Sequence, residues 1–209
     1  MRTLRFLGTI LLVTALSALA NPSATASSSA EVQVSRGGSA MAEFVSIEGC
    51  LQSSAFVLVT EQTFKQGPGP FQLEGRGGLL IVAVNDVCQQ TQKYEYGNFD
   101  SLALQINNVT SAKLRGTVVA YDISDPSVST RYAVSVDFVS SGASRPGTAH
   151  FNYQWTGGQT IYHGVGFYTP ATATGSIVAE GTGNNVIDGM TGTGILDQHR
   201  EGAVQIVRS

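Results

Sequence analysis

Apolar and polar residues alternate with a period of two along most of this chain. The clearest example is the segment 132–139, in which every second residue from Tyr132 to Phe138 is apolar. Such alternation is typical of a β-strand with one buried and one exposed face. No stretch shows the 3.6-residue period of an amphipathic helix. The sequence therefore predicts an all-β protein.

The strand-like segments are short and numerous, about eleven in all, with turn residues between them. The segment 79–88 is the most continuously apolar, and we predict that it is a strand buried on both faces. Short strands at such spacing are typical of antiparallel sandwiches and barrels. We therefore predict a single antiparallel β-sandwich, jelly-roll-like, with a closed β-barrel as the alternative. The other predicted strands are 31–35, 40–47, 55–60, 93–97, 102–106, 114–121, 132–139, 150–155, 160–168, 175–180 and 203–207.

The N-terminus has the pattern of a signal peptide. Arg2 and Arg5 precede the apolar run 6–19, and 18–20 is a small-x-small cleavage site, with a second one at 24–26. We predict a signal peptide over 1–20, with cleavage as late as 26, a disordered lead-in over 21–30 and one all-β domain over 31–209. We expect a secreted protein, extracellular or periplasmic, with no membrane span after signal removal.

The composition is weakly charged. The chain has 12 basic and 15 acidic residues, and charged residues make up 13%. No basic patch is visible along the sequence. Proteins that bind nucleic acid carry such a patch, so we expect no nucleic-acid partner.

The chain has two cysteines, Cys50 and Cys88. In an exported protein, two cysteines most simply form one disulfide, and two free thiols are the alternative. No His/Cys cluster accompanies them, so we expect no metal site and no cofactor.

The common catalytic motifs are missing from the sequence. A glycosidase needs only two carboxylates facing each other across a cleft, and such a pair has no local signature. Glu43, Glu95, Asp137 and Glu180 lie in or near predicted strands and are the candidates. Nothing in the sequence pairs any two of them, so we interpret them as solvated charges on strand faces.

The segment 150–165 reads as a hairpin with Gly157-Gly158 as its turn. This register places Tyr153 opposite Tyr162 and His150 diagonal to His163. The face that carries the aromatic residues could be a platform for sugar rings, although we favour the interpretation that it is the core side of the sheet. A metal at the histidines would need a third ligand, which is not evident. The candidate binding residues are Tyr153, Trp155 and Tyr162, which share that face with Phe151, and His150 and His163 on the other face.

Two segments near the C-terminus have a less specific interpretation. The Gly-rich stretch 181–194 reads as a loop or hairpin, although 181–189 looks somewhat like one calcium-binding nonapeptide. His199 lies in the polar segment 197–201, and we expect it to be solvated.

Several stretches together resemble a group of short, exported bacterial proteins of unknown function. They include Gly49-Cys50, Asp86-Val87-Cys88, the segment 111–122 and the ending 202–207. The resemblance implies an all-β exported domain and transfers no catalytic residue. In addition, 179–183 followed by 189–194 is similar to the closing hairpin of dirigent or allene-oxide-cyclase-like barrels.

These observations favour a non-catalytic secreted protein that binds a partner or interacts with a surface. The expected partner is an extracellular polysaccharide or a cell-surface component. The alternative is an extracellular hydrolase or a dirigent/cyclase-like barrel enzyme.

Overall fold

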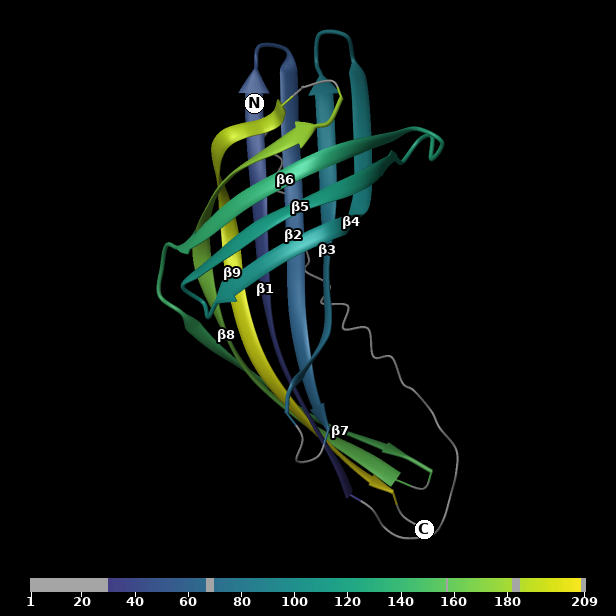
Figure 1. Ribbon diagram of the computed structural model, residues 1–209, viewed down its shortest axis with the longest axis vertical. Coiled ribbons are helices and arrows are strands. Elements are labelled where there is room, and N and C mark those ends of the chain that lie inside the picture. The colour runs from purple at the N-terminus through teal and green to yellow at the C-terminus, as the bar shows by residue number, and fades with distance from the viewer. Residues whose placement is uncertain (1–29, 67–69, 157, 182–184, 208–209) are drawn as a thin grey trace.

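The computed structural model describes residues 30–66, 70–156, 158–181 and 185–207, and all nine of its strands belong to one antiparallel sheet (Figure 1). The all-β antiparallel class predicted from the sequence is therefore confirmed. The predicted signal peptide and most of the lead-in lie outside the described residues. The strands are β1 (Ala30–Glu48), β2 (Leu51–Gln66), β3 (Gln72–Asp86), β4 (Thr91–Asn107), β5 (Ser111–Asp122), β6 (Ser129–Ser140), β7 (Arg145–Trp155), β8 (Gly158–Ala179) and β9 (Asn185–Val207).

The strands are longer than the sequence predicts. Separate predictions merge into β1, β4 and β8, because pairing to neighbouring strands continues through the glycines and polar residues between the apolar segments. Gly37 and Gly38, for example, pair with β2 on one side and β9 on the other. Of the two interpretations of 181–194, the hairpin is confirmed, because β8 and β9 pair up to Val178 and Asn185 and β9 begins at residue 185.

The strand order is β6-β5-β4-β3-β2-β1-β9-β8-β7, and a further pairing of β6 with β8 closes eight strands into a ring. In Figure 1, β4, β5 and β6 cross in front of β1, β2 and β3. The crossing begins where β4 leaves β3, because their pairing ends at Leu79 and Asn98 and the register of β4 shifts between Phe99 and Ser101. Such an irregularity bends a strand and increases its twist.

Alternate residues of the ring strands point into the ring and form the hydrophobic core. Phe44, Val57 and Phe138 are among the largest fully buried side chains. In β3, Leu80 and Val82 are buried, whereas the intervening Leu79, Ile81 and Ala83 are only half-buried. The prediction that 79–88 is buried on both faces is therefore wrong, because only one face of β3 looks into the ring.

Five strands of the ring continue past it as an open sheet, and β7 adds a sixth strand beside β8. We call this open sheet the extension. It consists of residues 30–37, 60–66, 72–77, 145–155, 158–168 and 197–207, in the strand order β3-β2-β1-β9-β8-β7. Figure 1 shows it below the crossing strands. β7 pairs only with β8 and is one of its two edges. We call the side that continues the core side of the ring the inner face, and the opposite side the outer face.

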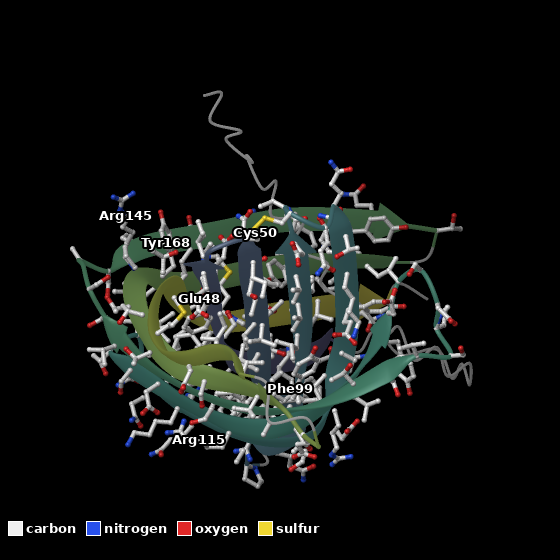
Figure 2. All side chains as sticks on the ribbon, turned by 90° about the horizontal axis from the view of Figure 1, so that it is seen from above. Glu48, Cys50, Phe99, Arg115, Arg145 and Tyr168 are labelled. Carbon is white, nitrogen blue, oxygen red and sulfur yellow. A yellow bond between two sulfur atoms is a disulfide. The ribbon has the colours of Figure 1, made fainter. Side chains whose placement is uncertain are left out.

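The predicted disulfide between Cys50 and Cys88 is confirmed, with their Cα atoms 5.5 Å apart. It joins the turn after β1 to the turn after β3 at the end of the ring remote from the extension (Figure 2). The amide of Val87 donates to the Cys50 carbonyl at 2.9 Å beside it. A disulfide is compatible with an oxidising compartment. Among the described residues, no helix is long and apolar enough to span a membrane.

Candidate functional site

The predicted hairpin exists as β7 and β8, but its register differs from the prediction by two residues. Trp155 pairs with Gly158, and Tyr153 lies opposite Thr160 instead of Tyr162. Tyr162 lies opposite Phe151, and the two rings stack with centroids 4.3 Å apart and planes 17° apart. A shift of two residues leaves every side chain on its predicted face, because strand side chains alternate with period two.

The aromatic face of the hairpin is exposed. Phe151 is 50% exposed and Tyr153 is 63% exposed. The interpretation of this face as the core side of the sheet is therefore wrong, since β7 lies past the ring and no second layer of described residues covers it. The side chain of Trp155, which was also predicted for this face, lies outside the described part of the structure. We call Phe151, Tyr153 and Tyr162 the aromatic platform.

His150 and His163 lie directly opposite each other on the inner face, and not diagonally as predicted. Their rings meet edge to face with centroids 6.2 Å apart. No third His, Cys, Asp or Glu joins them within the described ranges. The one group of three such residues found there is Cys50, Asp86 and Cys88, in which the cysteines are bonded to each other and Asp86 accepts the amide of Cys88 at 3.0 Å.

A carboxylate borders the aromatic platform. Glu201 lies opposite Gly164 of β8, and the Tyr162 ring folds over Gly164, where a Cβ would meet the phenol oxygen at 3.0 Å. The missing side chain therefore lets the Tyr162 hydroxyl donate to Glu201, and burial together with this hydrogen bond raises the pKa of Tyr162. The Ser35 hydroxyl approaches the other side of Glu201 at 3.5 Å.

Two residues further along β9, the imidazole of His199 hydrogen bonds to Asp197, with 2.8 Å between Nδ1 and Oδ1. The ring lies over Gly37 of β1, where a Cβ would meet Nε2 at 2.5 Å. The hydrogen bond to Asp197 raises the pKa of His199, although burial opposes it. The expectation that His199 is solvated is therefore wrong, because the segment 197–201 belongs to a central strand of the extension.

Sequence reasoning missed Asp197 and Glu201 as members of this site. A signal was present, because Asp197, His199 and Glu201 alternate along the chain and share one face if 197–201 is a strand. No strand was predicted over this polar segment, so the shared face was overlooked.

The four carboxylates considered for a glycosidase do not form a pair among the described residues. Asp137 pairs with Arg115 at 2.9 Å and Glu180 with Arg131 at 3.1 Å, both at the surface. Glu43 is exposed, whereas Glu95 is buried in the ring. The interpretation of these residues as solvated charges is thus wrong only for Glu95.

Glu95 is 1% exposed, and polar partners surround its carboxylate. Thr130 donates to it at 2.6 Å, the Lys93 ammonium lies 2.9 Å away and the Tyr132 hydroxyl also donates to it. Burial and this hydrogen bond raise the pKa of Tyr132. A buried carboxylate with this many partners is satisfied, so we assign the cluster a structural role.

No family model, curated protein or solved structure matches the chain. Its function has to be inferred from its own geometry. The outer face of the extension combines aromatic rings, two carboxylates and an imidazole on the three adjacent strands β7, β8 and β9. Such a face can bind a ligand with both apolar and hydroxyl-bearing surface.

Proposed function

We propose that the protein is an exported, non-catalytic binding protein that holds a neutral polysaccharide on the outer face of the extension. The observation that carries the proposal is the exposed Phe151–Tyr162 stack bordered by Glu201. Exposed apolar surface rimmed by polar groups marks interaction sites in soluble proteins.

Sugar rings fit this face chemically. A pyranose presents C–H groups on one side, which pack on aromatic rings, and hydroxyl groups at its rim, which donate to carboxylates. Glu201 supplies a carboxylate beside the platform, and Asp197 supplies a second one further along β9. They repel anionic sugars, so the expected ligand is uncharged.

The proposal is tested by screening the mature protein on a glycan array and titrating the best neutral oligosaccharide by calorimetry. Phe151→Ala should weaken binding about tenfold, because the stacked ring is lost. Phe167→Ala is the matched control, since Phe167 is also 50% exposed but belongs to the inner face of β8. Its affinity should equal that of the wild type.

Equal losses in Phe151→Ala and Phe167→Ala would place the ligand elsewhere. The absence of any neutral glycan from the array hits would overturn the proposal as a whole. Tyr162→Phe separates the two parts of the site, because it keeps the stacked ring and removes the hydroxyl that donates to Glu201.

A further inference from the structure

Two arginines face each other across adjacent strands on the inner face of the extension. Arg36 of β1 lies directly opposite Arg200 of β9. Like charges at opposed positions destabilise a sheet, and within the described ranges Arg200 has no carboxylate partner. Such a pair is tolerated where a ligand supplies the missing negative charge.

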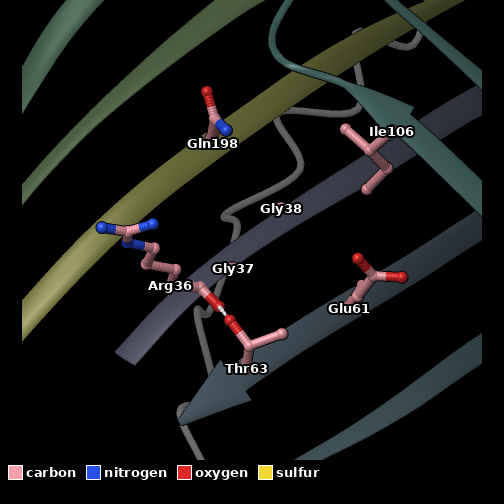
Figure 3. A pocket seen from close by; sticks show the side chains of 7 residues that line it. All are labelled: Arg36, Gly37, Gly38, Glu61, Thr63, Ile106 and Gln198. Carbon is pink, nitrogen blue, oxygen red and sulfur yellow. Dashed lines mark hydrogen bonds between the residues drawn. The ribbon is translucent and has the colours of Figure 1, made fainter. Parts of the chain in front are cut away.

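A cavity of about 110 Å³ adjoins Arg36 (Figure 3). Its wall holds hydrogen-bonding groups from three strands, which are Arg36 of β1, Glu61 and Thr63 of β2, and Gln198 of β9. The apolar Ile106 of β4 also lines it. Gly37 and Gly38 form part of its lining without side chains. The site is therefore small, polar and open to an extended ligand at Arg36.

The positive charge continues from this cavity in two directions. On one side, Arg36 lies 4.2 Å from the centroid of the Phe71 ring, and the Lys65 ammonium lies 5.8 Å from the same centroid. On the other side, Glu61 pairs with Arg76, which lines a second cavity of about 320 Å³.

Lys113 and Arg115 of β5 complete the lining of this second cavity. Arg115 pairs with Asp137, whereas Lys113 has no ion-pair partner in the part of the chain that the structure describes. Exposed ion pairs of this kind are weak, so they leave the cations able to bind an external anion. We call the set of Arg36, Lys65, Arg76, Lys113, Arg115 and Arg200 the basic track.

We propose that the basic track is a second binding site, which takes a carboxylated polysaccharide. It does not rest on the function proposed for the outer face, because the track begins on the opposite face of the sheet. The guanidinium fork of arginine matches a carboxylate with two hydrogen bonds. No basic patch is visible along the sequence because five different strands contribute the cations of the track.

The chemistry favours a polyuronate over nucleic acid. Glu61 and Asp137 interrupt the track. These carboxylates accept hydrogen bonds from sugar hydroxyls and repel a continuous row of phosphates. The one ring on the track, Phe71, lies under Arg36 and is half-buried, so successive bases have no exposed platform on which to stack.

The experiment compares two forms of one polymer, polygalacturonate and its methyl ester, which differ only in the charge of the carboxyl groups. The mature wild-type protein should bind polygalacturonate at low ionic strength and release it in about 0.5 M NaCl. It should show no detectable binding to the methyl ester. The double variant R200Q/K113Q should bind at least about tenfold more weakly, because two charge-assisted contacts are lost. Arg145→Gln is the control, since Arg145 and Arg115 extend from opposite sides of the molecule (Figure 2).

Stability gives a second readout that a structural role would not produce. Arg200→Gln relieves the repulsion with Arg36, so its melting temperature should rise by about 1 to 2 °C while its affinity falls. Equal binding of the two polymers, equal losses in the R200Q/K113Q and Arg145→Gln variants, or tighter binding of a single-stranded oligonucleotide would overturn the proposal. Phe151→Ala should bind polygalacturonate normally, so the failure of either proposal can be told from failure of the other.

Discussion

The ring and the extension share the strands β1, β2, β3, β8 and β9, yet the same alternation of side chains has different outcomes in the two regions. In the ring, alternate residues of β1 such as Ala40, Ala42 and Phe44 are fully buried. In the extension, the same parity of β1 presents Val32 and Arg36 to the inner face, and both are exposed. The alternation of β1 therefore continues from the ring into the extension, but the sheet is not closed into a ring there.

The difference teaches where this fold leaves room for function. Closure of the ring gives its strands neighbours and a shared core, which supplies the stability. The extension is stabilised by strands that continue from the ring, so its two faces do not have to pack against a core. The outer face carries aromatic rings and carboxylates, and the inner face carries the opposed arginines.

The largest expected contrast is between two phenylalanines. Phe138 is 1% exposed in the ring, and Phe138→Ala should lower the free energy of unfolding by about 3 to 5 kcal/mol through lost burial and a cavity. Phe151→Ala in the extension should lower it by less than about 1.5 kcal/mol, because only the stacked pair is lost. Urea denaturation measures both, and similar losses would mean that the extension has a core of its own.

A second contrast uses two tyrosines that each donate to a glutamate. Tyr132→Phe leaves the buried Glu95 short of a partner and should cost about 2 kcal/mol. Tyr162→Phe should cost about 0.5 kcal/mol, since water can replace the lost donor at the half-exposed Glu201. The same denaturation experiment decides, and a larger loss in Tyr162→Phe would contradict the division between ring and extension.

The fold class could be predicted because period-two alternation is a local signal. The segment around Phe138 alternates in the sequence and lies in β6 as predicted. The disulfide could be predicted from the count of two cysteines together with the expected export of the chain. The extent of each strand could not, since pairing through Gly37 and Gly38 depends on neighbours distant in the chain.

The candidate site shows the same limit. The predicted register of the hairpin was wrong by two residues, but its faces were predicted correctly because the shift was even. Whether Phe151 is buried depends on which strands cover it, and alternation carries no such information. The pairing of Arg36 with Arg200, which are distant in the chain, likewise follows only from the register between β1 and β9.

The smallest expected effect concerns the pH dependence of the extension. The hydrogen bond to Asp197 raises the pKa of His199 in the folded protein, with Glu201 adding to the effect. Protonated His199 therefore contributes stability that is fully present below its ordinary pKa of about 6.5 and is lost as the pH rises through the raised value.

The contribution of the protonated His199 to stability should be under about 1 kcal/mol, because the ion pair is partly exposed. His199→Gln should flatten the stability profile above the ordinary histidine pKa of about 6.5, and urea denaturation at a series of pH values measures it. An unchanged slope in His199→Gln would show that the Asp197–His199 pair contributes nothing to folding, and the outer face of the extension would then be held by backbone pairing alone.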